Sequence, residues 1–357
     1  MPPSTSMPPA ASAPQQRALR DLTTLRIGGP ADVIDAEDDS TALEAVRDAD
    51  GSGVPLLVIG GGSNIVAADE PLPGRVLRMA TRGIAATSTG DGTVEVCIAA
   101  GVDWDSAVAE AVASGWSGIE SLSGIPGRAG ATPIQNVGAY GREIADVLVK
   151  VRTWDRREQR ERVLTRDECA FAYRTSALKS ASGRWLILDV TLRLGTGAVV
   201  PVPAYADLRD RLGQSDSTIA DIRSAVLELR RSKGMVLDDD DRDSWSAGSF
   251  FLNPILDADH AERLPADAPR WPQPDGRVKT SAAWLIEQAG FARGWAPPEL
   301  GTPPRASLST KHTLAVTNRG PGSADDVLAV ARGVREGVRE RFGITLEPEP
   351  VLIGCAL

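Results

Sequence analysis

Ser123-Gly-Ile-Pro-Gly-Arg-Ala-Gly-Ala-Thr-Pro-Ile-Gln-Asn-Val-Gly-Ala-Tyr-Gly141 is the stretch that decides the fold of this 357-residue chain. Its five glycines allow positive φ angles and close approach to the backbone, and its two prolines stiffen the bends between them. The amides of Gln135 and Asn136 can both donate and accept hydrogen bonds. Such a loop suits a large polar ligand with phosphates and a heteroaromatic ring, although its glycine and proline content alone also fits a surface loop between strands.

A second glycine-rich segment lies earlier in the chain. The apolar run 54–59 predicts a short buried strand, and it continues directly into Gly60-Gly-Gly-Ser-Asn64. Three flexible amides followed by a hydroxyl and an amide are typical of a phosphate-binding loop. The segment is not a Rossmann fingerprint, because the G-x-G-x-x-G spacing fails at Ile65, and it lacks the Gly-Lys-Ser/Thr of a P-loop.

The composition narrows the class of protein. A formal net charge of -9 argues against a nucleic-acid backbone as the main partner, although local basic residues can still bind a phosphorylated small ligand. The three cysteines, Cys97, Cys169 and Cys355, are far apart and odd in number, which argues against a disulfide framework. The two histidines, His260 and His312, argue against a His-based metal site.

The chain carries no sign of membrane attachment in its sequence. No apolar run approaches the ~18 to 20 residues that a membrane-spanning helix needs. The segment 1–16 is rich in Pro, Ser and Ala without an apolar core, so we expect a disordered tail of a cytosolic protein rather than a signal peptide. The total length suggests two or three domains.

Hydrophobic periodicity predicts a mixture of helices and strands without internal repeats, and therefore an α+β protein. Predicted helices cover 40–49, 103–114, 218–231, 280–288 and 323–342, with Ser40, Thr218 and Ser323 as N-caps. Predicted strands cover 54–59, 93–99, 147–154, 186–194 and 314–316. Four consecutive acids, at 238–241, predict a solvated loop.

Seven short blocks in this order resemble the UDP-N-acetylenolpyruvoylglucosamine reductase family of flavin enzymes, from about residue 20 to the end. The blocks are Arg26-Ile-Gly-Gly, Gly60-Gly-Gly-Ser-Asn64, the Ser123–Gly141 stretch, Tyr173-Arg-Thr-Ser176, Gly248-Ser-Phe-Phe251, Trp284-Leu-Ile-Glu287 and Leu346-Glu-Pro-Glu349. The resemblance implies FAD as cofactor, NADPH as reductant and UDP-N-acetylglucosamine enolpyruvate as substrate, reduced to UDP-N-acetylmuramate for peptidoglycan synthesis. No separate nicotinamide motif is evident, so the choice between NADPH and NADH stays open, and one shared pocket predicts inhibition by excess substrate.

The resemblance also implies a domain organisation. It predicts a two-part FAD-binding scaffold of the vanillyl-alcohol-oxidase type, with 17–80 plus 343–357 as one part and 81–231 as the other. A smaller α/β substrate-binding domain follows at 232–342. We expect a small-molecule UDP-sugar partner, no nucleic acid, no membrane and no metal, and a monomer or weak oligomer in the cytoplasm.

The resemblance assigns FAD contacts to the glycine-rich segments and to residues beside them. These are Arg26, Gly60, Gly61, Gly62, Ser63, Asn64, Gly124, Ile125, Pro126, Gly127, Gln135, Asn136, Gly138, Ala139 and Tyr140.

Three residues match the family's catalytic positions. Reduction of an enol ether conjugated to a carboxylate needs a hydride on the terminal carbon and a proton on the inner carbon. Arg174 can hold that carboxylate with a two-point fork, unless it forms an ordinary surface ion pair. Ser249 matches the proton donor; it has no G-x-S-x-G context and no evident His partner, and the alternative is a capping or packing serine. Glu349 matches the essential acid, but Glu347 would share its face in an extended strand and remains the alternative.

Four further positions match the substrate's diphosphate and uridine contacts: Tyr205, Lys233, Asn253 and His312. Lys233 offers a point charge for phosphate, or it is an ordinary lysine at a helix end. Tyr205 resembles a mobile-loop tyrosine, or it is packed inside; His312 could equally be a partly buried structural histidine. The acidic stretch between Lys233 and Ser249 is longer than the family pattern, which leaves the register of Lys233 open.

Two other functions remain to be separated from this one. Another FAD-dependent oxidoreductase on the same scaffold would explain the two glycine-rich loops but not Arg174, Ser249 and Glu349 together. A non-catalytic nucleotide-sugar or flavin-binding protein would tolerate loss of Ser249 with unchanged ligand affinity, and it would not oxidise NADPH.

Overall fold

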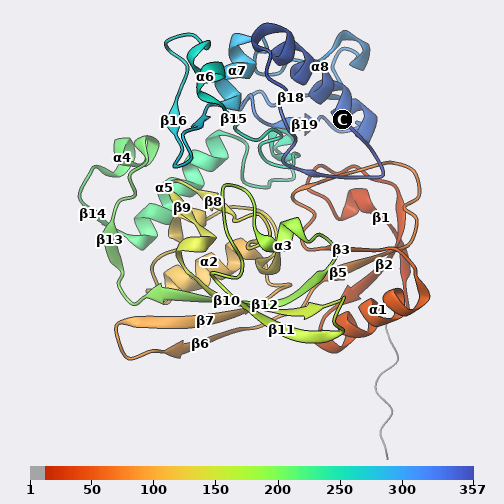
Figure 1. Cartoon of the computed structure of the whole chain (residues 1–357), viewed down its shortest axis with the longest axis vertical. Helices are drawn as coiled ribbons and strands as arrows, with labels where there is room; N and C mark the ends of the chain where they lie inside the picture. Colours follow the sequence, from red (N-terminus) through yellow and green to blue (C-terminus); the bar gives the residue numbers. More distant parts are fainter. Residues whose placement is uncertain (1–12) are drawn as a thin grey trace, which may run out of the picture.

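The computed structural model describes residues 13–357, which form three regions that pack against one another (Figure 1). The first region holds a four-stranded sheet in the order β1-β2-β5-β3. Its strands are β1 (Gln15–Ala18), β2 (Pro30–Ala36), β5 (Arg75–Met79) and β3 (Leu56–Ile59), with β2, β5 and β3 parallel and β1 antiparallel. Residues 1–12 of the predicted tail lie outside the described residues, whereas Gln15 and Gln16 are in β1 rather than in a tail.

Helix α1 (Asp39–Ser52) connects β2 to β3. It starts one residue earlier than predicted, because the N-cap is Asp38 and not Ser40. The Asp38 carboxylate accepts the Thr41 N–H at 2.8 Å, and the Ser40 hydroxyl only supports that carboxylate. Two residue types that both favour N-caps stand two positions apart here, so sequence alone does not decide between them.

The C-terminal strand returns to the first region. Strand β20 (Val351–Ile353) pairs in parallel with β4 (Ile65–Ala67), which directly follows the Gly60–Asn64 loop. The pairing places the Leu346–Glu349 block beside that loop, because the Val351 N–H donates to the Asn64 carbonyl at 2.9 Å.

The second region is built on a five-stranded antiparallel sheet in the order β11-β10-β12-β7-β6. These strands are β6 (Ile84–Ser88), β7 (Thr93–Ala99), β10 (Leu148–Asp155), β11 (Arg160–Thr165) and β12 (Trp185–Gly195). Helix α2 (Trp104–Ala113) buries Trp104 and Val108 in the same apolar core. The alternating leucines and valine of 186–194 are all buried, as their period of two predicts.

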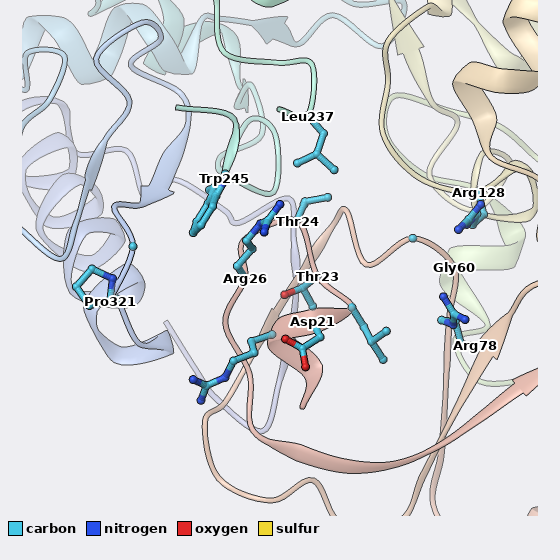
Figure 2. Close-up of a pocket in the computed structure, with 15 residues that line it drawn as sticks. Asp21, Thr23, Thr24, Arg26, Gly60, Arg78, Arg128, Leu237, Trp245 and Pro321 are labelled. Carbon is cyan, nitrogen blue, oxygen red and sulfur yellow. The ribbon is translucent and has the colours of Figure 1, made fainter. Parts of the chain in front are cut away.

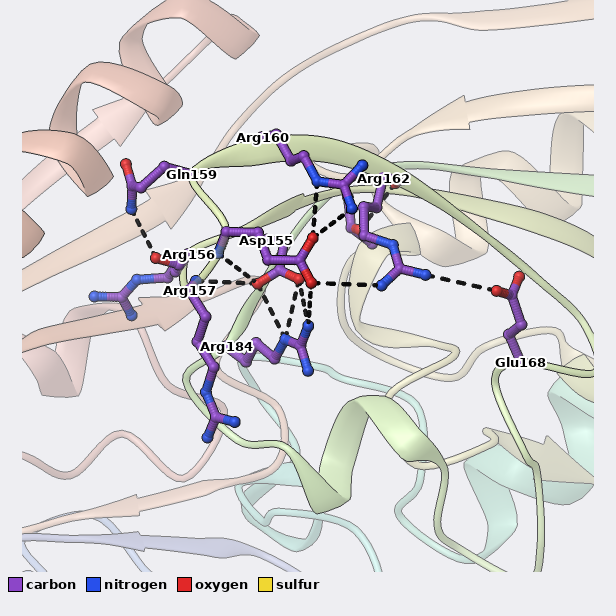
Figure 3. A network of polar contacts seen from close by, with 10 residues as sticks. Asp155, Arg156, Arg157, Gln159, Arg160, Arg162, Glu168 and Arg184 are labelled. Carbon is purple, nitrogen blue, oxygen red and sulfur yellow. Dashed lines mark hydrogen bonds and ion pairs between the residues drawn. The ribbon is translucent and has the colours of Figure 1, made fainter.

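Arginines on strand β10 and in the turn that follows it attach the second region to the first. Arg152 bridges Asp39 of α1 and Asp189 of β12, both at 2.5 Å, and Arg156 pairs with Asp50. At the end of β10, Asp155 accepts a fork of hydrogen bonds from Arg184 and the N–H groups of two following residues (Figure 3). These bonds, Arg184 first, lower the pKa of the buried Asp155 carboxyl to about 2. The two regions are therefore joined by the partly exposed Arg152–Asp39 and Arg156–Asp50 ion pairs, whereas the Asp155–Arg184 pair stiffens the second region itself.

The third region packs helices α7 (Ala282–Gln288) and α8 (Ala324–Phe342) around small sheets. The sheets contain β15 (Ile255–Leu256), β16 (Trp271–Pro272), β17 (Val278–Lys279), β18 (Ala306–Leu308) and β19 (Val316–Asn318). Ser323 and Asp326 form a capping box at the start of α8, and Gly343, with φ 70°, ends it as predicted. The strand predicted at 314–316 lies instead at 316–318, because the Ala315 N–H closes a turn onto the His312 carbonyl.

Helix α5 (Ile219–Ser232) begins at Thr218, as predicted, and leads from the second region into the third. Before it lies a protruding segment with β13 (Val199–Pro201), α4 (Ala206–Leu212) and β14 (Asp216–Thr218) (Figure 1). The remaining short elements are α3 (Ala177–Ser180), α6 (Ala258–Glu262), β8 (Gly138–Ala139), β9 (Arg142–Glu143), and the 3-10 helices η1 (Leu19–Asp21), η2 (Glu120–Leu122), η3 (Ala129–Ala131), η4 (Ile144–Asp146), η5 (Arg242–Ser244) and η6 (Pro298–Leu300). This mixture confirms the α+β prediction. Within residues 13–357, every helix is too short or too polar to cross a bilayer.

Candidate active site

The two glycine-rich segments lie side by side. A Cβ on Gly61 would be 2.9 Å from the Gly127 Cα, and a Cβ on Gly62, at φ 60°, would be 2.0 Å from the Leu22 carbonyl oxygen. The Asn64 amide donates to the Gln135 side chain at 3.0 Å, which joins the far ends of both segments. Gly61 and Gly62 must therefore be glycines, because their backbone packs directly on the backbone of other segments. Their backbone N–H groups can then bind a ligand.

A cavity of about 620 Å³ runs along the Gly60–Asn64 segment. Figure 2 shows Gly60, Arg78 and Arg128 toward one end, and Arg26 and Trp245 toward the other. Arg78 is already paired with Asp35 and Arg26 with Asp239, whereas Arg128 and Arg20 line the cavity without an ion pair within residues 13–357. These cations and the bare glycine backbone fit the two phosphates of a dinucleotide, and the volume lies in the usual range for small-ligand sites. Arg78 and Arg128 were missed at the sequence level, although Arg128 stands inside the Ser123–Gly141 stretch and Arg78 interrupts an apolar strand.

The acidic segment 238–243 ties the third region to this cavity. Asp239 pairs with Arg26, whose guanidinium also lies 4.2 Å above the Trp245 ring. Asp241 pairs with Lys311 at 2.7 Å, so the segment is anchored at both ends. The prediction of a solvated loop is confirmed for the exposure of 238–240 but misses these ion pairs, which depend on distant residues.

Arg174 of the Tyr-Arg-Thr-Ser block and Glu349 of the C-terminal block form an ion pair, with 3.3 Å between Nε and Oε1. Arg174 has φ 53°, and its guanidinium donates to the Gly138 carbonyl at 2.8 Å and to the Asn136 carbonyl at 3.3 Å. The side chains of the pair are 21% and 14% exposed. The pair is thus not an ordinary surface ion pair, because its arginine is anchored on two carbonyls of the Ser123–Gly141 stretch.

Glu349 is the half-buried acid of the Leu346–Glu349 block, whereas Glu347 is exposed. Both residues flank a single antiparallel bridge at Pro348, where the Glu347 carbonyl accepts the Leu252 N–H and the Glu349 N–H donates to the Phe250 carbonyl, so burial and not backbone pairing distinguishes the two acids. Burial raises the pKa of the Glu349 carboxyl above its usual value, and the charges of Arg174 and Lys179 offset part of this increase.

Ser249 lies in a segment held against Glu349 by the backbone. The Glu349 N–H donates to the Phe250 carbonyl at 2.9 Å, and the Phe250 N–H donates to the Leu314 carbonyl at 2.7 Å. The rings of Phe250 and Phe251 are buried and pack edge to face, which fixes the segment. Ser249 is half-buried. Within residues 13–357 its hydroxyl forms no hydrogen bond and caps no helix, so it is available to a ligand.

The substrate-binding candidates separate into two groups. Lys233 and His312 lie close together, and Lys233 pairs with Asp207 at 2.8 Å on the protruding segment. Burial lowers the pKa of the His312 imidazole to about 4, and the charges of Lys233 and Arg293 act in the same direction, so the ring is neutral at pH 7. Tyr205 stacks edge-on against Tyr140 with 5.0 Å between ring centroids, yet it is 38% exposed rather than packed inside.

Asn253 lies apart from that group, beside Tyr173 of the Tyr-Arg-Thr-Ser block. Its side-chain oxygen accepts the Ala282 N–H at 2.9 Å and so supports the first turn of α7. Sequence analysis did not identify Tyr173 or Lys179 as functional, although both adjoin Arg174 closely; the Lys179 ammonium donates to the Arg174 carbonyl at 3.1 Å.

We expect Gly62→Ala to lower retention of the cofactor at least about tenfold, because a side chain at φ 60° against the Leu22 carbonyl costs about 1–3 kcal/mol of strain. The measurement is the flavin-to-protein absorbance ratio after gel filtration, with Gly51→Ala as control. Gly51 lies in α1 with no atom near its missing Cβ, so that variant should retain cofactor like the parent. Equal retention by Gly62→Ala and the parent would contradict the backbone-packing account.

We expect Glu349→Gln to lower turnover by about 10²-fold or more, and Glu347→Gln to change it less than about twofold. Only Glu349 contacts Arg174, and Glu347 is exposed. The measurement is steady-state kcat for both variants. A larger loss of turnover in Glu347→Gln than in Glu349→Gln would show that Glu347, and not Glu349, is the functional acid.

Glu349 also predicts a pH dependence of stability. Since folding raises its pKa, its contribution is fully present below the unfolded-state pKa of about 4.3 and is lost as pH rises through the higher folded-state pKa. Glu349→Gln should therefore increase Tm relative to the parent at pH 8 more than at pH 4. An equal Tm difference at both pH values would show that the buried carboxyl is not destabilising.

The chain is similar to known proteins over 95% of its length. Residues 240–353 match the family model described as UDP-N-acetylenolpyruvoylglucosamine reductase, C-terminal domain, and residues 30–163 match an FAD binding domain. The UDP-N-acetylenolpyruvoylglucosamine reductase of Thermobifida fusca is 51% identical over 353 residues, covering 95% of this chain and 97% of that protein. The enzyme of the same name from Cutibacterium acnes is 48% identical, covering 95% and 90%. The crystal structure of UDP-N-acetylenolpyruvylglucosamine reductase from Thermus caldophilus superimposes with a TM-score of 0.65 at 26% identity, covering 95% and 98%.

Proposed function

Because the chain belongs to the UDP-N-acetylenolpyruvoylglucosamine reductase family, we propose that Arg174, Ser249 and Glu349 are the residues with which it carries out that family's reaction. The protein is an FAD-containing oxidoreductase that reduces the C=C bond of UDP-N-acetylglucosamine enolpyruvate with NADPH and forms UDP-N-acetylmuramate. The observation that carries the assignment of the site is the Arg174–Glu349 pair at 3.3 Å, in which the arginine is anchored on the Ser123–Gly141 stretch and the acid belongs to the C-terminal block.

The residues present fit FAD. Gly61 and Gly62 pack against the backbone of Gly127 and Leu22, and arginines line the cavity beside them, where a diphosphate can bind. We propose that Gly60–Asn64 and Arg26 hold the diphosphate part, and that the 124–127 and 135–140 segments hold the ring system. The chemistry that FAD supplies there when bound is to carry a hydride from NADPH to the substrate.

Arg174 holds the substrate carboxylate in this proposal. Hydride addition to the terminal carbon of the enolpyruvyl group breaks the C=C π bond and moves the electron pair toward the carboxylate. The guanidinium, fixed by the Gly138 carbonyl, stabilises that charge electrostatically.

Ser249 completes the reduction by donating its hydroxyl proton to the inner carbon, so that one hydride and one proton add across the double bond. A hydroxyl is a weak acid, but the carbon that it protonates is strongly basic, and the fixed position of the segment favours the transfer. Glu349, whose pKa is raised, holds a proton to higher pH than an ordinary carboxyl and stabilises the same intermediate.

The UDP part of the substrate is assigned to Lys233, His312, Tyr205 and Asn253. Lys233 supplies charge to the diphosphate, and the neutral His312 ring supplies a donor and an acceptor rather than a second charge. Tyr205 lies on the protruding segment that Asp207 ties to Lys233, which suits a contact that forms as the ligand arrives. A cytoplasmic location and a monomeric or weakly associating protein belong to the same proposal.

The experiment that tests this function is product analysis by mass spectrometry after incubation with NADPH and UDP-N-acetylglucosamine enolpyruvate. The expected product is heavier than the substrate by two hydrogens, and UDP-N-acetylglucosamine itself, which has no double bond to reduce, remains unchanged. NADPH consumption without that product would favour another oxidoreductase on the same scaffold.

A further inference from the structure

Asp243 is the buried member of the acidic segment 238–243. Its residue is 4% exposed, whereas residues 238–240 are exposed. None of the catalytic and binding roles assigned above uses Asp243. A carboxylate is stable inside a protein only where hydrogen bonds and opposite charge replace its lost hydration, so the contacts of Asp243 indicate its role.

The contacts of the Asp243 carboxylate come from two later segments of the third region. It accepts the Thr310 N–H at 2.8 Å and the Thr310 hydroxyl at 2.5 Å. The Arg319 guanidinium donates to it at 2.8 Å. Burial acts to raise the pKa of this carboxyl, but the hydrogen bonds from Thr310 and the charge of Arg319 lower it below its usual value. Asp243 is therefore ionised at neutral pH and holds Thr310 through two bonds.

Thr310 belongs to a tight turn that carries His312. The hydroxyl of the buried Ser309 accepts the N–H groups of Lys311 at 3.0 Å and of His312 at 3.2 Å. The Ala315 N–H closes the turn onto the His312 carbonyl at 3.1 Å. The internal bonds fix the shape of the turn, and the bonds to Asp243 fix its place in the molecule.

Asp243 also packs against the residue that follows Lys233. A Cβ on Gly234, at φ 66°, would be 2.9 Å from both the Cβ and the carbonyl oxygen of Asp243. The charge of Lys233 lowers the pKa of His312, so the two side chains are near each other. Asp243 thus contacts the backbone beside Lys233 and, through its carboxylate, the turn that carries His312.

We propose that Asp243 is a positioning residue for substrate binding, which fixes the His312 turn relative to Lys233 so that both side chains reach the UDP part together. The inference rests on the proposed function, which assigns Lys233 and His312 to that part of the substrate. Asp243 itself does not contact the ligand in this proposal. Its effect is to order two binding groups in advance, which lowers the entropy that binding costs.

The test uses the FAD-loaded enzyme and its variants. Asp243→Asn keeps the size of the side chain and removes the charge, whereas Thr310→Val removes one hydrogen bond and leaves the buried carboxylate in place. Asp240→Asn is the matched control, because Asp240 is an exposed acid of the same segment. His312→Ala, alone and combined with Asp243→Asn, completes a double-mutant cycle. Thr310→Val takes the place of Asp243→Asn in the cycle if the latter fails to fold.

We expect binding of UDP-N-acetylmuramate, measured by titration of the flavin absorbance, to weaken about tenfold in Asp243→Asn and about threefold in Thr310→Val. Asp240→Asn should bind like the parent. The KM for the enolpyruvyl substrate should rise in parallel, while kcat falls less than about twofold because the proposed catalytic groups are unchanged. With His312→Ala already present, Asp243→Asn should weaken binding by less than about twofold, because the group that it positions is gone.

Unchanged affinity in a folded Asp243→Asn enzyme would overturn the proposal. An equal loss with and without His312 would also overturn it, since Asp243 would then not act through the turn. The parent enzyme separates these results from the function itself. If the parent neither binds UDP-N-acetylmuramate nor reduces the substrate, the assigned reaction has failed and the role of Asp243 fails with it; an active parent with unaltered binding in Asp243→Asn refutes the role of Asp243 alone.

Discussion

Arg174→Ala is expected to slow reduction of the enolpyruvyl substrate by about 10²–10³-fold, which corresponds to about 3–4 kcal/mol of lost charge stabilisation. Reduction of the flavin by NADPH should change much less, because the lost interaction is with the substrate carboxylate. The measurement is rapid-mixing absorbance of each half-reaction in isolation. Normal turnover in the variant would eliminate Arg174 as the group that stabilises the intermediate.

Because Arg174 also donates to the Asn136 and Gly138 carbonyls, its removal can disturb the segment that those residues belong to. Arg174→Lys separates the two effects. A lysine keeps the charge but not the planar fork, so it should restore flavin retention and recover only part of the rate. If flavin content falls in parallel with the rate in both variants, the role of Arg174 is to hold the loop.

Ser249→Ala is expected to reduce the flavin with NADPH normally and to stall when the enolpyruvyl substrate is added, with the second step slower by about 10²–10⁴-fold. The hydroxyl forms no hydrogen bond within residues 13–357, so its removal should leave Tm almost unchanged. Full product formation by Ser249→Ala would exclude Ser249 as proton donor.

Ser249→Cys provides the matched control, because a thiol of similar size still carries a proton. We expect it to recover part of the lost rate, whereas Ser246→Ala, in the same segment, should retain most activity. The Ser246 hydroxyl accepts the Gly248 N–H at 3.2 Å and thus shapes the segment without facing the reaction.

The elements that were predicted correctly carry their signals locally. Strand β7 was predicted residue for residue, and the buried face of α8 with its Ser323 cap and Gly343 end follows from period and capping alone. The seven family blocks likewise predict the FAD-binding scaffold and the activity, which the family models and relatives confirm.

The parts that sequence could not supply are those made by distant residues. The Arg174–Glu349 pair and the Asp239–Arg26 contact join segments far apart in the chain, and neither leaves a periodic signal. The burial of Glu349 but not Glu347 depends on contacts of the C-terminal block with distant segments, among them Arg174 and the pairing of β20 with β4.

The most direct test of the account is the anaerobic visible spectrum of the purified protein, recorded before NADPH, after NADPH, and after addition of the enolpyruvyl substrate. The account predicts flavin absorbance that bleaches with NADPH and returns in full with substrate. Bleaching without return would contradict the assigned substrate, and absence of bound flavin, even after FAD is added, would contradict the cofactor site itself.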